Sequence, residues 1–113
     1  MRKFLIMISV LLIALIATSS IAANNFGNKR KGKYLYRKVY KTCMDRGEMK
    51  SPKPILDPDS KKMAEWTQVF SEKKFDEFKC TKEWSNLTDT DAKDIYTYLY
   101  SFAADSPTPA KCK

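Results

Sequence analysis

The sequence contains no histidine. Histidine is the commonest metal ligand and general base in proteins, and it is the usual proximal ligand of haem iron. Its absence excludes Ser-His-Asp and Cys-His catalysis, Cys2His2 zinc sites and any haem held by an imidazole. Glycine is also scarce, with three residues in 113, which excludes collagen-like sequences and glycine-rich phosphate loops. No constellation of catalytic groups is visible, so we expect a protein that is not an enzyme.

A short apolar segment opens the chain. Two cations precede an almost unbroken apolar run over residues 4–17, and a row of mostly small residues follows it. This layout is typical of a secretory signal peptide, here over residues 1–23, with cleavage after Ala22 or Ala23. The alternative is an uncleaved membrane anchor, for which the run is short. We therefore expect an exported protein with one mature domain over residues 24–113.

Charge is unevenly distributed along the chain, whose net charge is +8. All 13 acidic residues follow Lys41, whereas a cluster of cations comes before Thr42. The cluster consists of Lys29, Arg30, Lys31, Lys33, Arg37, Lys38 and Lys41. Interleaved tyrosines would also suit a nucleic acid, but export argues against that partner. We expect these cations to bind an acidic protein or an anionic membrane surface; the alternative is a solvated face without a partner.

The spacing of apolar residues predicts three helices and no strand. The first helix is expected over residues 31–42 and should end before Gly47. Three prolines predict an irregular loop over residues 48–60. Ser60 could then cap a second helix that runs to about Glu72.

The third helix has the strongest pattern. Thr88 and Asp91 form a Thr-x-x-Asp cap, Ile95 and Leu99 lie on the apolar face, and the helix should end near Asp105 because prolines follow. The segment between the second and third helices is ambiguous. The predicted fold is all-α, with three main helices joined by long loops.

Several segments resemble a known family. The residues GKYLY at 32–36, followed by YKTCM at 40–44, are similar to the first helix and haem-attachment segment of small c-type cytochromes. The last helix and the tail over 103–113 resemble those of periplasmic cytochromes c. The resemblance implies a small cytochrome c-like fold, a bacterial periplasmic location and an acidic periplasmic redox protein as partner. It also implies that Gly32 and Tyr36 pack against residues 98 and 99 of the last helix.

The family's haem-attachment pattern, Cys-x-x-Cys-His, is degenerate here. Tyr40 stands at the first cysteine position, Cys43 at the second and Met44 at the histidine position. We therefore expect no cofactor and no small-molecule substrate, but a non-haem accessory or interaction protein that works beside periplasmic electron-transfer proteins. The alternative is an electron carrier that binds haem atypically, through one thioether at Cys43 and a ligand other than histidine. A third hypothesis is copper binding by Cys43, Met44 and Met49.

The three cysteines are an odd number for an exported protein, and the sequence does not choose among their three pairings. A Cys80–Cys112 disulfide would tie the C-terminal tail to the start of the last helix. Loop entropy would make that disulfide worth about 3–4 kcal/mol. Cys43 would then remain as a thiol.

Overall fold

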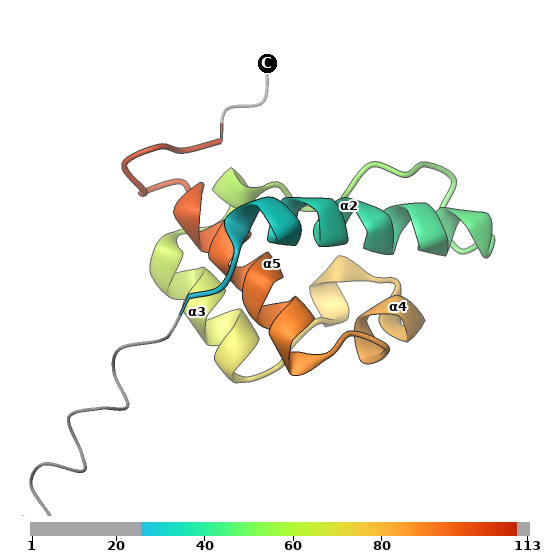
Figure 1. Ribbon diagram of the computed structural model, residues 1–113. Coiled ribbons are helices and arrows are strands. Elements are labelled where there is room, and N and C mark those ends of the chain that lie inside the picture. Colours follow the sequence, from blue (N-terminus) through green and yellow to red (C-terminus); the bar gives the residue numbers. More distant parts are fainter. Residues whose placement is uncertain (1–25, 111–113) are drawn as a thin grey trace, which may run out of the picture.

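The computed structural model describes residues 26–110, and this part of the chain is all-α, without a strand (Figure 1). The elements are α2 (Lys29–Asp45), η2 (Pro58–Ser60), α3 (Met63–Ser71), η3 (Asp76–Phe78), α4 (Thr81–Ser85) and α5 (Asp89–Ser101), where η marks a 3-10 turn. The all-α prediction is confirmed, and the ambiguous segment folds as η3 and the short α4. The predicted signal peptide lies outside the described residues. Within the described part, no helix is long and apolar enough to cross a membrane.

Helix α2 begins and ends on local signals. The side chain of Asn28 accepts hydrogen bonds from the backbone N–H groups of Arg30 and Lys31, at 3.0 and 3.2 Å. This cap satisfies two of the N–H groups that a helix start leaves unpaired. The helix ends at Asp45, and its C-cap Arg46 is followed by Gly47 with a φ of +94°, a conformation that favours glycine. The predicted helix was therefore correct in position and several residues too short.

Helix α5 begins as the sequence predicts. The Thr88 hydroxyl accepts from the Asp91 N–H at 3.1 Å, and the Asp91 carboxylate accepts from the Thr88 N–H. Ile95 and Leu99 are fully buried. The helix ends at Ser101, four residues before the expected end, because the chain turns back on itself there.

The expected cap of the second helix is wrong. Ser60 lies in η2, where its hydroxyl accepts from the Asp57 N–H at 3.0 Å. Helix α3 begins only at Met63, whose N–H donates to the Asp105 carboxylate at 2.7 Å, across 42 positions of sequence. The start of α3 is thus fixed in part by a distant side chain, which no local pattern reports.

Helices α2 and α5 cross at close range (Figure 1). A Cβ atom placed on Gly32 would overlap the backbone carbonyl of Asp94, so the helices meet there backbone to backbone. One turn further on, the rings of Tyr36 and Tyr98 lie 6.2 Å apart. The crossing of the two helices is confirmed, although Gly32 lies against Asp94 and Ile95, earlier on α5 than the resemblance implied.

Aromatic rings fill the interior between α2, α3 and α4. Phe78 stacks on Trp84 at 4.3 Å and on Trp66 at 5.9 Å. Their buried neighbours Tyr36 and Tyr40 donate their hydroxyl hydrogens to the Leu56 carbonyl at 2.6 Å and the Phe78 carbonyl at 2.9 Å. Burial raises the pKa of Tyr40 to about 12 and that of Tyr36 further. The phenols therefore remain protonated and tie irregular segments to the core.

Candidate functional site

The seven clustered cations are all exposed on α2. Its buried residues are Gly32, Tyr36, Val39, Tyr40 and Cys43, and these face the core. The cations are all exposed, on the parts of the helix surface that these residues leave to solvent. We call Lys29, Arg30, Lys31, Lys33, Arg37, Lys38 and Lys41 the basic face. All seven sequence-predicted docking residues are therefore exposed on α2, where the helical spacing of 3.6 residues per turn spreads them over about half of the circumference.

The cations of the basic face lower the stability of α2. Three of its cations stand in the first turn of α2, which contains no acidic residue. Cations at a helix N-terminus interact unfavourably with the helix dipole. Four of them, at positions 29, 33, 37 and 41, also follow one another at intervals of four, where like charges repel. Each such conflict costs a few tenths of a kcal/mol or more.

Nothing in the described part of the chain neutralises these charges by an ion pair. Arg46, Lys61 and Lys74 form ion pairs, and within residues 26–110 no ion pair involves the basic face. Lys29 and Lys38 instead lie 5.7 and 6.0 Å from the ring centres of Phe102 and Tyr34. The charge is thus presented to solvent.

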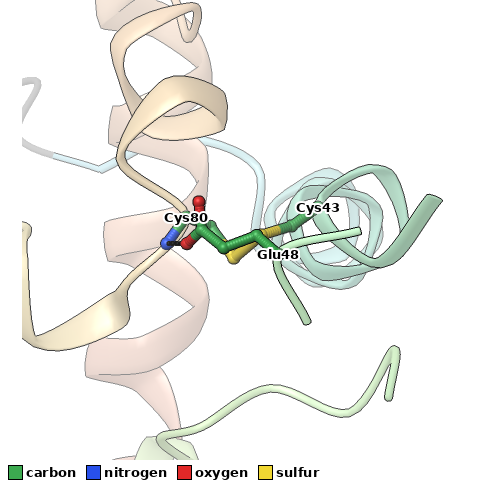
Figure 2. A group of neighbouring side chains, drawn as sticks. All are labelled: Cys43, Glu48 and Cys80. Atoms are coloured by element: carbon green, nitrogen blue, oxygen red, sulfur yellow. Dashed lines mark hydrogen bonds between the residues drawn. A yellow bond between two sulfur atoms is a disulfide. The ribbon is translucent and has the colours of Figure 1, made fainter. Parts of the chain in front are cut away.

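The second candidate site is a disulfide between Cys43 and Cys80, at the C-terminal end of α2 (Figure 2). Their Cα atoms lie 5.8 Å apart, and both residues are fully buried. The expected Cys80–Cys112 disulfide is therefore wrong, and so is the expectation that Cys43 is a thiol. Residue 112 lies outside the described residues. The folding of α2 against the η3–α4 segment decides this pairing, which the sequence left open.

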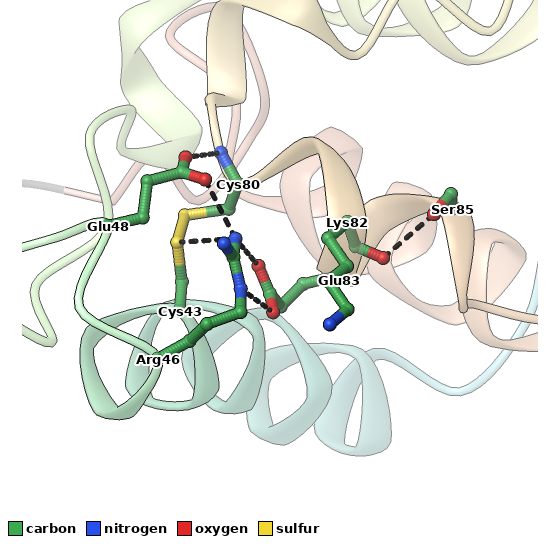
Figure 3. Close-up of polar contacts among 7 residues, drawn as sticks. All are labelled: Cys43, Arg46, Glu48, Cys80, Lys82, Glu83 and Ser85. Carbon is green, nitrogen blue, oxygen red and sulfur yellow. Dashed lines mark hydrogen bonds and ion pairs between the residues drawn. A yellow bond between two sulfur atoms is a disulfide. The ribbon is translucent and has the colours of Figure 1, made fainter.

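A charged cluster that the sequence did not reveal surrounds the disulfide (Figure 3). Arg46 donates two hydrogen bonds to the Glu83 carboxylate, from Nε at 3.0 Å and from Nη2 at 2.7 Å. The same Nη2 lies 2.7 Å from Glu48, whose other oxygen accepts from the Cys80 N–H at 2.8 Å. Cys80 and its neighbour Lys79 both have positive φ angles, so these bonds hold a turn that side chains rarely adopt. The signal that the sequence offers for this cluster is that charged residues of opposite sign stand close to the two cysteines along the chain.

Arg46 controls the ionisation of both acids. Its hydrogen bonds lower the pKa of Glu83 and of Glu48 below their usual range, and the two carboxylates raise the pKa of Arg46. Glu83 is only 7% exposed. An ionised carboxylate so buried is stable here because the guanidinium pairs with it in a bidentate geometry. We therefore assign the cluster a structural role, which is to hold the disulfide segment on α2.

The residues at the degenerate haem-attachment motif do not fit a haem. Tyr40 is fully buried with its hydroxyl bonded to Phe78, and Cys43 forms the disulfide. Met44 is half-buried beside them. The ligand atoms of Cys43, Glu48 and Cys80 lie within 4.8 Å of one another, as a metal site requires, but the sulfur atoms are bonded to each other and offer no thiolate. The disulfide likewise removes Cys43 from the copper set with Met44 and Met49.

Comparisons with protein-family models, with curated proteins and with solved structures find no match to this chain. The resemblance to cytochromes c therefore remains a hypothesis.

Proposed function

We propose that this protein is a non-catalytic, haem-free interaction protein that binds an acidic protein surface through the basic face of α2. The observation that carries the proposal is seven exposed cations on one helix, none of which forms an ion pair in the described chain. Several of them also interact unfavourably with the helix dipole or with one another. Where a sequence violates a local rule without a structural gain, a binding role is the expected reason. A positive surface of this kind attracts and orients an acidic partner.

The composition of α2 favours a protein over a membrane as the partner. A helix that inserts into a membrane interface needs a free apolar face beside its cations. The apolar face of α2 packs against α5, and Tyr34, at 63% exposed, is the large apolar side chain left outside. The basic face therefore suits a purely electrostatic contact. The resemblance to cytochromes c points to a periplasmic electron-transfer protein as the acidic partner.

The Cys43–Cys80 disulfide argues against the haem alternative. A thioether at Cys43 needs a free thiol, so this disulfide would first have to be reduced. We expect protein produced in a host with active cytochrome c maturation to be colourless and to have the mass of the polypeptide alone. A Soret band together with the added mass of one haem would overturn the haem-free proposal.

A matched pair of charge-reversal variants tests the docking surface. Lys33→Glu with Arg37→Glu removes the centre of the basic face, whereas Lys53→Glu with Lys82→Glu changes the net charge equally at exposed cations outside α2. Binding to poly-L-glutamate, used as an acidic polypeptide probe, is measured by calorimetry at low salt. We expect the first variant to bind at least about tenfold more weakly and the second to lose less than about threefold.

Equal losses in the two variants would show a general effect of net charge and would contradict a dedicated surface. A parallel titration with vesicles that contain anionic phospholipid separates the two kinds of partner. Binding to the vesicles that is stronger than binding to the polypeptide, and that depends on Lys33 and Arg37, would make a membrane the partner and overturn this part of the proposal.

A further inference from the structure

A large cleft lies on a part of the molecule that does not involve α2. Residues from the end of α3, the loop after it, α4 and the first half of α5 enclose about 670 Å³. Small-molecule sites in proteins commonly have volumes of 300–1,000 Å³. No residue of α2, and neither cysteine of the disulfide, lines this cleft. The cleft therefore shares no residue with the basic face, and nothing in the sequence pattern predicts it.

Aromatic rings form much of the cleft wall. Phe75 and Trp84 are stacked, with ring centres 5.0 Å apart and planes within 22° of each other. Phe70 lies 5.4 Å from Tyr96 and 6.3 Å from Trp84. Such a surface favours flat rings, which can stack on it or meet it edge to face. The lining contains no histidine, cysteine or methionine, so it offers haem iron none of its usual nitrogen or sulfur ligands.

The charges at the cleft are balanced. Two lysines and two aspartates line it, namely Lys73, Lys93, Asp76 and Asp89. Lys93 and Asp89 stand four residues apart on α5, a spacing that places both on the same side of the helix. The cleft therefore selects neither anions nor cations, which distinguishes it from the basic face.

The two serine hydroxyls of the cleft, at Ser71 and Ser85, are better acceptors than donors. Ser71 and Ser85 donate their hydrogens to the carbonyls of Gln68 and Lys82, at 3.2 and 2.8 Å. A hydroxyl whose hydrogen is used in this way keeps lone pairs on its oxygen. Thr67 and Tyr96 share one hydrogen bond of 2.8 Å between their hydroxyls, which uses the hydrogen of one of them. A ligand that reaches these two serines is thus recognised best if it brings its own donor.

We propose that this cleft binds a small, flat, uncharged ring compound with an N–H or O–H donor at its edge, such as an indole or a phenol. The ring would contact Phe70 and Phe75, with the buried Trp84 behind them, and the donor would reach an oxygen of Ser71 or Ser85. Balanced charge excludes a preference for a carboxylate, and the aromatic wall disfavours a purely polar ligand. The inference stands independently of the proposed docking function, because the two surfaces share no residue.

Three related compounds test the proposed recognition. Indole has an N–H donor, 1-methylindole lacks it, and indole-2-carboxylate adds a negative charge. We titrate each into the 15N-labelled full mature chain and follow the backbone amide signals by NMR. Indole should give saturable shifts at residues of the cleft. The other two compounds should bind at least about fivefold more weakly. 1-Methylindole cannot donate the hydrogen bond, and the carboxylate of indole-2-carboxylate finds no partner for its charge.

Two substitutions of alanine by leucine, one in the cleft and one outside it, test where indole binds. Ala92 lines the cleft on α5, whereas Ala64 is exposed on α3 outside it. Ala92→Leu should fill the cleft and weaken indole binding at least about tenfold, and Ala64→Leu should leave it unchanged. Ser85→Ala removes one acceptor without adding volume and should weaken binding a few-fold if Ala92→Leu does not fold.

Several outcomes would overturn the proposal. They are shifts that do not saturate, shifts that map to another surface, equal affinity for indole and 1-methylindole, and undiminished binding by a folded Ala92→Leu variant. Cleft signals that move with protein concentration alone would mean that a second copy of the chain covers the cleft.

Discussion

Gly32 on α2 lies directly against the backbone carbonyl of Asp94 on α5, with no space for a side chain between the two helices. The same aspartate, which is buried, accepts a hydrogen bond from the Asn28 N–H at 2.8 Å, next to the start of α2. The helix crossing and the start of α2 therefore depend on one position of α5. A buried carboxylate beside a helix N-terminus also interacts favourably with the helix dipole.

Replacing Gly32 by alanine should destabilise the domain. A Cβ atom would collide with backbone atoms of α5, which cannot rotate away as a flexible side chain can. We expect a loss of at least about 2 kcal/mol in the free energy of unfolding, although alanine is intrinsically the better helix former. Urea unfolding of Gly32→Ala is compared with Lys33→Ala, at an exposed position of the same helix. A Gly32→Ala variant as stable as the wild type would show that the helices are not in backbone contact.

The Cys43–Cys80 disulfide should be the main covalent source of stability. It joins residues 37 positions apart, and loop entropy then contributes about 4 kcal/mol. Cys43→Ala should lower the melting temperature strongly, whereas Cys112→Ser should change it little. Peptide mapping without reduction checks the pairing itself. A peptide that links Cys80 to Cys112 in the wild type would contradict the disulfide described above.

The cluster around Arg46 predicts sensitivity to acid. Because the folded pKa of Glu83 is lower than the unfolded pKa, its contribution is complete above the unfolded value and is lost as pH falls through the folded one. Stability should therefore begin to fall as the pH drops below about 5 and should continue to fall below the ordinary pKa of a glutamate. Glu83→Gln should cost about 1–2 kcal/mol at neutral pH and make this acid dependence shallower.

The matched control for this variant is Glu77→Gln. Glu77 is 59% exposed and pairs with Lys61 at the surface, so its loss should change stability by less than about 0.5 kcal/mol. Melting temperatures measured across the pH range compare the two variants. If stability depends on acid in the same way in Glu83→Gln and in the wild type, the Arg46 cluster is not the source of the acid sensitivity.

Stability and binding should respond oppositely to a charge change on α2. Lys33→Glu places an acid near the helix start. The new acid would lie beside the cations at positions 29 and 37, four residues away in each direction, and would attract them. We expect about 0.5–1 kcal/mol of added stability together with weaker binding of poly-L-glutamate. Lys33→Gln should show smaller changes in the same directions. A Lys33→Glu variant that is less stable than the wild type would mean that the cations of α2 contribute to the fold.

The sequence could predict features that depend on neighbours along the chain. The cap at Thr88 and Asp91 and the buried face of α5 follow from local hydrogen bonding and helical spacing, and the structure confirms both. The start of α3 could not be predicted in this way, because it depends partly on Asp105, 42 positions away.

The disulfide pairing was beyond sequence reasoning for a related reason. The loops closed by Cys43–Cys80 and by Cys80–Cys112 have similar lengths, and their closure entropies are nearly equal. The packing of η3 and α4 against α2 makes the choice. The Arg46 cluster and the aromatic cleft likewise exist only after distant segments have come together.

Residue-resolved NMR titration with poly-L-glutamate tests the central claim most directly. The amide signals of the 15N-labelled mature protein are followed at low salt and again at physiological salt. We predict shifts concentrated on the exposed positions of α2 from Lys29 to Lys41, with weaker binding at the higher salt. Shifts spread evenly over all exposed lysines, or centred on α3 and α4 while α2 stays unperturbed, would contradict a dedicated docking surface on the basic face.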